Sequence, residues 1–554
     1  MNSNSPNRRR MQTLISIFAV VVLWSTFGAR CHSAESEALR GIVSSDQEPQ
    51  MEGVLVSAKK VGGTITVTVV TDNRGRYAFP SSRLQPGKYR LHIRAAGYDL
   101  DDPGVIDLGA NNKVTELNLK LRNTSDLAQQ LTNAEWLMSV PGNYEDKKPL
   151  LGCVSCHTLY QPLHSKFDAK ALADLVHQMR TFAEFSVFVP GELRIVGMRT
   201  YNVPKREEDV KFAEYLSSIN LSSATEGKWK YELKTLPRPK GRATKVIITE
   251  YDLPRRDWQP HDASVDPEGM IWFSDFSSLT LGRLDPRTGS VKEWKMPALK
   301  PDVAGGCLDV YLDKTSNPWV IMMHQGAVAK FDRKTEKFTT RSMPSEYYDN
   351  NVRLGMVAVA ADGMVWIKDS GNLRVFKIDP QSGKVGTYPM PHEFYGMDLD
   401  ARGNLYLASL AKGVIGDLDA KTGKVITYPT PTPDSGAHRG HMDPEDRFWF
   451  AETNAGGKIG MFDTRTKQIR EWSIPTPWAG PYDAVRDKNG DVWAGGEFSD
   501  RVSRLDPKTG QVTEYLLPSS TNIRRVDVDN STTPVTFWIG GNHEAKLIRL
   551  EPLD

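Results

Sequence analysis

The chain has 554 residues, of which 39% are hydrophobic and 25% are charged, and this composition excludes a disordered or collagen-like protein. Lys and Arg number 70 against 68 Asp and Glu, so the net charge of +2 leaves no basic surplus for a nucleic-acid partner. Four cysteines in this length exclude a disulfide-rich scaffold. At roughly 100–200 residues per domain, we expect about three to five domains.

Residues 1–34 have the organisation of a secretory signal peptide. Arg8-Arg9-Arg10 precede an apolar run, Met11–Trp24, and small and polar residues follow it. The run is shorter than the roughly 20 residues of a membrane-spanning helix, and no later stretch is long and apolar enough to cross a membrane. We therefore expect a periplasmic or secreted protein, or one tethered only at its N-terminus if the segment is not cleaved.

Residues 38–122 alternate apolar and polar side chains, with Gly and Pro at the breaks, which is typical of short strands. Asp72–Gly75 and Gln85–Gly87 are predicted hairpin turns. The order of these segments, closed by Ala96-Gly97-Tyr98, resembles the carboxypeptidase regulatory-like domain. That resemblance implies a seven-stranded β-sandwich related to transthyretin, which serves as a spacer or a binding module.

Residues 123–220 change to an apolar spacing of three to four residues, as in Ala169–Met179 and Glu207–Leu216, which predicts helices. Residues 221–245 are polar and basic and contain two prolines and a glycine between 237 and 241, so we predict a linker there.

Residues 246–554 repeat every 40 to 47 residues, and each repeat is marked by an aromatic residue after a turn. The marks are Trp272, Trp319, Trp366, Tyr406, Trp449, Trp493 and Trp538. A period in the forties without helical spacing predicts a β-propeller with one four-stranded blade per repeat, here seven blades. Only six outer strands follow the marks, so residues 248–254 are expected to supply the seventh and close the ring.

Cys153-Val154-Ser155-Cys156-His157 is a C-x-x-C-H motif, which attaches haem c through two thioethers and ligates the iron with its His. A zinc site is poorly supported because no second cysteine pair lies nearby. Covalent attachment requires export in bacteria, which agrees with the signal peptide. We predict one covalent haem c held by Cys153, Cys156 and His157.

The sixth iron ligand is expected to be Met198, which precedes the helix around Glu207–Ser217. This order resembles class I c-type cytochromes, and the resemblance implies a small α-helical cytochrome c domain over residues 123–220. Met179, inside the preceding helix, and then His177 are the alternatives. A His/Met pair would give the haem a higher potential than a bis-His pair.

The positions 11 residues before the aromatic marks start the inner strands and are expected to ring the mouth of the central channel. They are His261, Leu308, Gly355, Tyr395, His438 and Tyr482, with Arg524 in the last blade. Three acidic residues follow the marks at the third position: Asp275, Asp369 and Glu452. His438 and Glu452 are 14 residues apart, and the strand length predicts that they lie near the same channel.

Trp449-Phe450-Ala451-Glu452 with Lys458-Ile459-Gly460 resembles the streptogramin B lyase (virginiamycin B lyase) family of seven-bladed propellers. The resemblance implies a lyase site in which His438 acts as a catalytic base, Glu452 binds Mg²⁺ and the substrate is a depsipeptide. Tyr395 stands where the partner His is expected, and this departure predicts weak or no cleavage of the antibiotic. His441 is a nearby substitute at a different strand phase.

Three functions are compatible with this mainly β, multidomain organisation. The first is an exported haem c electron-transfer protein whose propeller binds or acts on a small substrate, with the haem accepting electrons and a periplasmic redox partner removing them. Fusion to a cytochrome favours this function, because a lyase reaction is redox-neutral. The second is a metal-dependent lyase with the cytochrome in a separate role, and the third is a non-catalytic electron carrier whose β-domains dock partners.

Overall fold

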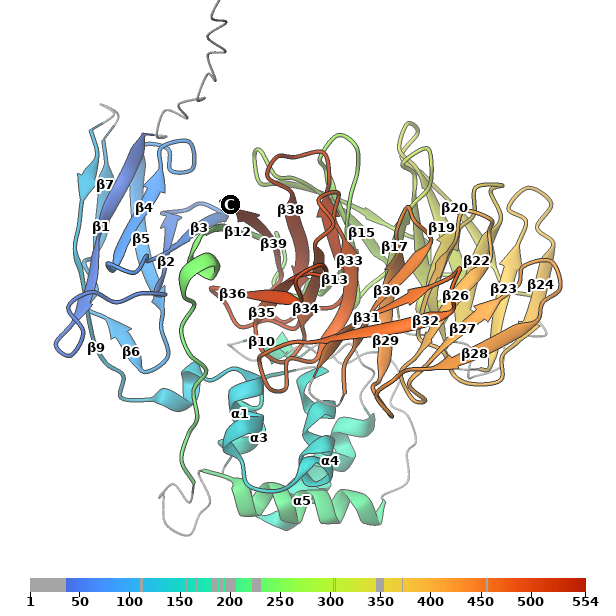
Figure 1. Cartoon of the computed structure of the whole chain (residues 1–554), viewed down its shortest axis with the longest axis horizontal. Helices are drawn as coiled ribbons and strands as arrows, with labels where there is room; N and C mark the ends of the chain where they lie inside the picture. The colour runs from blue at the N-terminus through green and yellow to red at the C-terminus, as the bar shows by residue number, and fades with distance from the viewer. Residues whose placement is uncertain are drawn as a thin grey trace, which may run out of the picture. The chain divides into compact units, whose positions relative to one another are not determined.

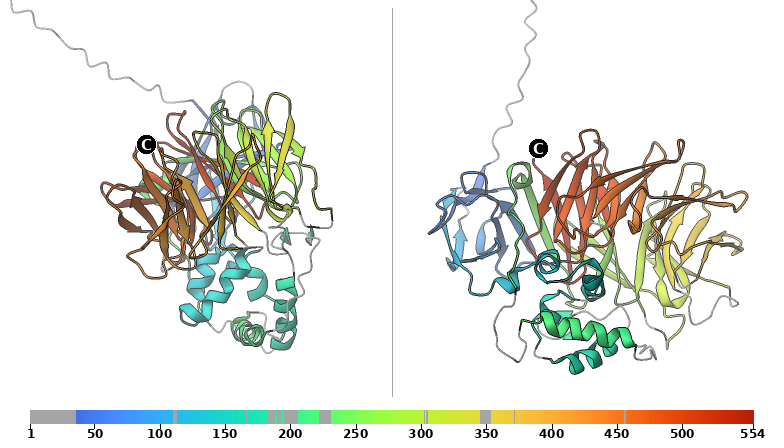
Figure 2. Two further views of the ribbon diagram at one scale, coloured as in Figure 1. Left: turned by 90° about the vertical axis from the view of Figure 1, so that its right-hand side faces the viewer. Right: turned by 60° about the horizontal axis from the view of Figure 1, so that its bottom comes forward.

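The computed structural model describes residues 36–554 except for 110–112, 156, 166, 182–187, 190–192, 195–205, 222–230, 302, 304, 345–352, 371 and 455–456. The predicted signal segment lies outside the described residues, as do Cys156 and Met198. In the described part, no helix is both long and apolar enough to span a membrane. The architecture is mainly β, with a β-sandwich, a short helical region and a propeller of repeated sheets (Figures 1 and 2).

The β-sandwich encloses one hydrophobic core between two sheets. One sheet has the order β4-β1-β9-β6 with β8 beside β1, and the other contains β3-β2-β5-β7. Alternation explains the layering, since Tyr77 and Phe79 of β4 are buried while Arg76 and Ala78 between them are exposed. The strands are β1 (Glu37–Ser45), β2 (Leu55–Lys60), β3 (Ile65–Val70), β4 (Arg76–Pro80), β5 (Gly87–Arg94), β6 (Tyr98–Leu100), β7 (Val105–Leu108), β8 (Thr115–Glu116) and β9 (Leu119–Asn123).

The helical region that follows has its own core, which includes Trp136, Leu150, Val154 and Leu216. Its longest helices, α4 and α5, pack against each other. The elements are η1 (Leu127–Gln130), α1 (Asn133–Ser139), α2 (Tyr144–Lys147), η2 (Lys148–Ser155), α3 (Tyr160–Leu163), α4 (Ala169–Thr181), β10 (Phe188–Val189), β11 (Leu193–Arg194) and α5 (Glu207–Ile219).

Seven four-stranded antiparallel units form the propeller in the described part of the chain. Blades 1 to 3 are β13 (Pro260–Val265), β14 (Ile271–Asp275), β15 (Thr280–Asp285), β16 (Ser290–Lys295); β17 (Cys307–Leu312), β18 (Pro318–Met322), β19 (Ala327–Asp332), β20 (Lys337–Ser342); and β21 (Leu354–Val359), β22 (Val365–Asp369), β23 (Arg374–Ile378), β24 (Val385–Pro389). Blades 4 and 5 are β25 (Gly396–Leu399), β26 (Leu405–Ser409), β27 (Val414–Leu418), β28 (Val425–Pro429); and β29 (Ala437–Met442), β30 (Arg447–Glu452), β31 (Lys458–Asp463), β32 (Gln468–Ser473). Blades 6 and 7 are β33 (Pro481–Arg486), β34 (Val492–Gly496), β35 (Arg501–Asp506), β36 (Gln511–Leu516); and β37 (Val526–Asp529), β38 (Thr536–Gly541), β39 (Lys546–Pro552), β12 (Val246–Asp252). Short 3₁₀ helices, η3 (Gly241–Thr244) and η4 (Met323–Gln325), complete the elements.

The aromatic marks are buried and tie each blade to its preceding turn. Trp272 donates its indole N–H to Asp266, six residues earlier, at 2.9 Å. The same bond recurs at Trp319, Trp449 and Trp493. In the turn before Trp272, Gly269 has φ +76°, a conformation that favours glycine. Burial of the ring is common to all seven marks and explains why this position repeats, whereas the N–H of Trp366 and of Trp538 has no partner among the described residues.

The ring closes with a strand from the start of the propeller sequence. β12 pairs with β39 over Val246–Asp252, as the count of outer strands predicted. The other edge of β12 pairs with β3 of the sandwich, so one eight-stranded sheet, β37-β38-β39-β12-β3-β2-β5-β7, runs through both domains. The sequence analysis did not predict this shared sheet, because pairing with another domain leaves no periodic mark. Pairing on both sides leaves β12 without an open edge.

The described part of the predicted linker, residues 231–245, forms hydrogen bonds and an ion pair with the parts of the protein around it. It contacts the helical region, the sandwich and the propeller in turn. The contacts are Leu236 N–H to Glu135 (2.7 Å), Arg238 to Glu48 (2.5 Å) and Arg501 to the Pro237 carbonyl (2.9 Å). This polar segment therefore connects the helical region, the sandwich and the propeller through side-chain and backbone contacts.

Candidate functional site

Five inner strands of the propeller carry a β-bulge near their start. In β13, Pro260 lies opposite Asp275 whereas Ala263 lies opposite Phe273, so one extra residue is accommodated between them. The same one-residue shift occurs in β17, β21, β29 and β33. A bulge re-aims side chains that would otherwise alternate between the two faces of a strand. As a result, two layers of side chains meet across the channel. The predicted ring residues form the first, which we call the mouth layer. The residues directly after them in the sequence form the second, which we call the inner layer.

The mouth layer brings together residues of four blades. The His438 ring lies 4.5 Å from the Tyr395 ring and 4.1 Å from the Tyr482 ring, measured between centroids. The Tyr395 and Tyr482 hydroxyls share a hydrogen bond. The Tyr482 hydroxyl also lies 3.4 Å from Nε2 of His261. Contacts between non-adjacent blades place these four side chains in the channel.

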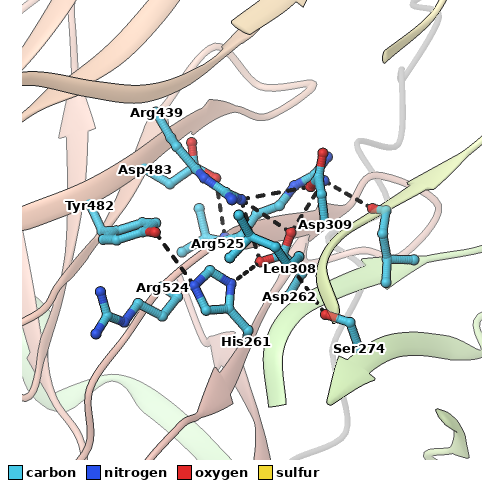
Figure 3. A network of polar contacts seen from close by, with 12 residues as sticks. His261, Asp262, Ser274, Leu308, Asp309, Arg439, Tyr482, Asp483, Arg524 and Arg525 are labelled. Atoms are coloured by element: carbon cyan, nitrogen blue, oxygen red, sulfur yellow. Dashed lines mark hydrogen bonds and ion pairs between the residues drawn. The ribbon is translucent and has the colours of Figure 1, made fainter. Parts of the chain in front are cut away.

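The inner layer is a buried ion network (Figure 3). Nη1 of Arg439 lies 3.1 Å from Asp262 Oδ2 and 3.7 Å from Asp309 Oδ1. Arg525 pairs with Asp309 and lies 3.6 Å from Asp262. Burial raises the pKa of Asp309 to about 6, against the pull of Arg525. The network joins blades 1, 2, 5 and 7 and closes the channel beneath the mouth layer.

The hydrogen bonds of His438 define its tautomer. Thr453 donates its hydroxyl proton to the Pro481 carbonyl at 2.7 Å, so its oxygen accepts from Nδ1 of His438, 3.0 Å away. Nε2 is therefore the nitrogen with the lone pair. Burial, followed by the charges of Arg439 and Arg524, holds the pKa of His438 well below its usual value. The imidazole is neutral near pH 7 and can accept a proton.

His441 belongs to a different group of side chains. Its Nε2 lies 3.0 Å from Asp483 Oδ2. Burial lowers the pKa of His441, but the Asp483 carboxylate outweighs burial and the net shift is upward. Burial likewise raises the pKa of Asp483, and His441 reverses this to about 2. His441 neutralises a buried carboxylate rather than completing the His438 cluster.

The structure does not bring Glu452 into the His438 cluster. The nearest charged groups to its carboxylate are Glu471 and Lys458, and Lys458 pairs with Glu471 at 2.8 Å. Neither carboxylate oxygen of Glu452 has a hydrogen-bond partner among the described residues. Burial, together with Glu471, raises its pKa to about 8. An unpartnered carboxylate beside a second one suits a cation, but no group of three or more metal-ligating residues occurs in the described chain.

The other two acidic residues at the third position after a mark brace loops. Asp275 accepts bonds from Ser277 and Ser278, each at 2.7 Å, and pairs with Arg255. Asp369 pairs with Arg374 at 2.9 Å. We predicted that the acidic residues at this position share the channel with the ring histidines. Asp275 and Asp369 instead have a structural role in their loops.

Lys368 is a channel residue that the sequence analysis missed. It lies two positions after Trp366, where the other blades carry uncharged residues: Ser274, Ile321, Ala408, Ala451, Gly495 and Gly540. This position packs closely on the next blade, since a Cβ at Gly540 would lie 1.9 Å from the Pro260 carbonyl oxygen. Lys368 instead extends over the Tyr395 ring, 5.4 Å from its centre. Comparison of the repeats at this position is the signal that would have found it.

The C-x-x-C-H segment contacts the mouth layer. Asn522 Nδ2 donates to the Val154 carbonyl at 3.1 Å and to Glu497 at 3.2 Å. Glu497 pairs with Arg524 at 2.8 Å, and the Arg524 guanidinium lies 5.1 Å from the centre of the Tyr482 ring. A continuous series of contacts thus joins the residue after Cys153 to the tyrosines of the channel.

The described residues of the motif fit haem c. Nδ1 of His157 lies 2.9 Å from the Thr158 carbonyl, and donation of this proton leaves Nε2 to ligate iron. Burial lowers the pKa of His157, which favours the neutral, ligating form. Cys153 is half-buried against the helical core. Among the alternative sixth ligands, Met179 is half-buried, and Nδ1 of His177 is buried with no hydrogen-bond partner among the described residues.

A cavity of about 730 Å³ lies between the helical region and the mouth. The helical region contributes Tyr144, Glu145 and Lys148, which precede the haem motif. Blades 4 and 5 contribute Tyr395 and residues of the surrounding loops. The cavity is large enough for a small organic substrate, and Tyr395 connects it to the mouth layer.

Comparisons with known proteins agree with this architecture. The sequence profile of the Virginiamycin B lyase family matches residues 301–543. The propeller is virginiamycin B lyase-like. The profile of the carboxypeptidase regulatory-like domain matches residues 38–122. A search among curated proteins finds no relative.

Solved structures support the same fold. A streptogramin B lyase is 21% identical, with a TM-score of 0.50, and covers 56% of this chain and 100% of its own length. A catalytically inactive virginiamycin B lyase from Staphylococcus aureus with quinupristin is 19% identical (TM-score 0.49, 55% and 99% covered). The selenomethionine-substituted lyase from the same organism is 20% identical (TM-score 0.49, 55% and 99% covered). At 21% identity the similarity to the streptogramin B lyase supports the fold of the propeller and not an activity.

Proposed function

We propose that the chain is an exported electron-transfer protein of the haem c type, in which the mouth of the propeller binds a small substrate. The observation that carries the proposal is the contact of the haem motif with the mouth, from Val154 through Asn522 and Glu497 to Arg524. A haem c held by Cys153, Cys156 and His157 would supply a one-electron acceptor in the helical region, linked to the mouth by this series of contacts. A periplasmic redox partner would complete the cycle.

Within this function the chain's own residues have separate tasks. His438, neutral and with Nε2 as its lone-pair nitrogen, accepts a proton from the substrate. Tyr395 and Tyr482 form the aromatic wall against which a flat substrate packs. The ion pairs of the inner layer join the blades next to this wall.

Covalent haem is the first test. Acid–acetone extraction should leave the colour with the wild-type protein, and the Cys153→Ser, Cys156→Ser double variant should lose it. Cys307→Ser is the matched control, because Cys307 is buried in the propeller and takes no part in the motif. Full colour in the double variant would overturn the proposal. Met198→Ala should abolish the absorption band that marks Met ligation, whereas its loss in Met179→Ala alone would assign the ligand to Met179.

Substrate oxidation is the second test. Candidate small molecules should be screened for reduction of the haem, and a productive one should lose its effect in His438→Gln while the haem spectrum is unchanged. If no compound reduces the haem and the protein exchanges electrons rapidly with redox partners, it is a carrier without a substrate.

A metal-dependent lyase is the second candidate function, favoured by the buried and unpartnered carboxylate of Glu452 beside Glu471. Mg²⁺ bound there would polarise a carbonyl of a depsipeptide-like substrate. Glu452→Gln should then abolish Mg²⁺ binding and turnover. Turnover that survives removal of the haem would assign the activity to the propeller alone, and Tyr395→His should increase it.

A further inference from the structure

A buried ammonium group without an ion-pair partner lies beside the mouth layer, on β22. Lys368 is 2% exposed, and its only hydrogen bond within the described chain is to the Ser370 hydroxyl at 2.9 Å. No carboxylate lies within ion-pair distance of its Nζ among these residues. A buried charge is ordinarily paired, because removal from water is costly. Blade 3 also makes room for this arrangement, since a Cβ at Gly355 would lie 2.3 Å from Ser370 Oγ.

A second cation approaches the same ring with unused donors. Arg439 is fully buried, and only its Nη1 bonds to the inner layer. Its Nε and Nη2 have no partner in the part of the chain that the structure describes. The guanidinium lies 5.7 Å from the centre of the Tyr395 ring and 5.5 Å from that of Tyr482. The unpartnered N–H groups are therefore next to the mouth layer.

We propose that Lys368 and Arg439, which both lie against the Tyr395 ring, bind the carboxylate group of a small organic acid at the channel mouth. The ammonium and the free edge of the guanidinium supply charge-assisted hydrogen bonds to the two carboxylate oxygens. The rings of Tyr395, Tyr482 and His438 contact the body of the acid, so an aromatic acid fits best. This inference rests on the proposed function in that it names the substrate class of the same site.

Charge at the mouth supports an anion rather than a cation. Burial and, next, the charges of Arg439 and Arg524 hold down the pKa values of His261 and His438, whereas the Asp309 and Asp483 carboxylates act against them to a smaller extent. A divalent cation would meet repulsion there, whereas a carboxylate is attracted. Tyr395 is half-buried and lines the cavity, and it must turn aside for the acid to reach the two cations.

Proton uptake is the expected signature of binding. Burial lowers the pKa of Lys368 to about 7, with Glu393 and Asp369 raising it and Arg353 and Arg439 lowering it further. At pH 8, without ligand, the amine of Lys368 is therefore mostly neutral. A bound carboxylate favours the ammonium form, so binding should take up a proton and should weaken as the pH rises above about 7.

The test is calorimetric titration of the full-length protein with benzoate, with benzamide as the neutral match. At pH 6.5 we expect benzoate to bind at least about tenfold more tightly than benzamide, since a charge-assisted bond contributes roughly that factor or more. Lys368→Met should remove this preference. Lys377→Met is the matched control, because Lys377 also lies over an aromatic ring, that of Trp366, but on β23, away from the inner strands.

Three results would overturn the inference. They are equal binding of benzoate and benzamide, unchanged benzoate binding in a folded Lys368→Met protein, and no binding by the wild type of benzoate, phenylacetate or acetate. A check that needs no variant is calorimetric titration of the wild type with benzoate at pH 8 in buffers of different ionisation enthalpy, which measures proton uptake. The absence of proton uptake would also overturn the inference. Carboxylate binding by a protein without covalent haem would leave this inference standing while the proposed function failed.

Discussion

The mouth layer and the inner layer of the channel come from neighbouring residues of the same strands, yet their charges are satisfied differently. In the inner layer Arg525 faces two carboxylates, Asp309 and Asp262. Beside the mouth layer, Lys368 on β22 faces a hydroxyl and an aromatic ring. The Asp262, Asp309 and Arg525 charges of the inner layer compensate one another, whereas Lys368 and the unpartnered edge of Arg439 mark the place where an anion is missing. Variants that disturb one layer at a time can test this distinction.

The largest effect is expected in the inner layer. Arg525→Met leaves Asp309 and Asp262 with Arg439 as their one guanidinium partner, and an uncompensated buried carboxylate should lower the free energy of unfolding by about 3–5 kcal/mol. Urea denaturation measures this loss. Arg287→Met, which breaks an exposed pair with Asp285, is the control and should leave stability unchanged. A loss no larger than that of the control would show that the inner layer is not a structural closure.

The opposite sign is expected in the mouth layer. Without ligand, Lys368→Met should raise the free energy of unfolding at pH 6 by on the order of 2–4 kcal/mol, because it removes a buried charge. The pKa of Lys368 falls from 10.5 to about 7 on folding, so the unfolded chain binds more protons between these values and the wild type becomes more stable as the pH rises through them. The advantage of the variant should therefore disappear towards pH 10.5. Destabilisation at pH 6 would mean that Lys368 has a partner in solution.

A smaller effect on the free energy of unfolding is expected for the pair of His441 with Asp483. Asp483 raises the pKa of His441 in spite of burial, so the pair stabilises the protein fully below the ordinary His pKa of about 6.5 and less as the pH rises through the raised value. His441→Gln should lower stability at pH 6 by on the order of 1 kcal/mol and by less at pH 9. Unfolding at the two pH values checks this, and a difference that grows with pH would contradict it.

The smallest expected effect concerns the Tyr482 hydroxyl, which joins three blades of the mouth layer. Tyr482→Phe removes the bonds to Tyr395 and His261 and should lower the free energy of unfolding by about 1 kcal/mol. Thermal unfolding measures it. An effect as large as that of Arg525→Met would mean that the mouth layer also holds the blades together.

The repeat made much of this architecture predictable, and its irregularities limited the prediction. Buried aromatic residues every 40 to 47 residues predicted the blades, the closing strand and the ring from His261 to Tyr482. The inner layer was missed because a bulge, which no periodicity records, turns Asp262 and Arg439 to the same side as their neighbours. Glu452 was assigned to the His438 cluster from strand length alone, and spacing along a strand does not determine the direction of a side chain.

The shared sheet has a consequence for the order in which the protein is made. The sandwich precedes every blade in the chain, so β3 is available to pair with β12 before β39 is present. β39, the partner of β12 on its other edge, is the last strand of the chain. β39 then pairs with a strand that is already fixed to a folded domain, which shortens the search for ring closure. Pairing with β3 also covers one edge of β12 that could otherwise promote aggregation.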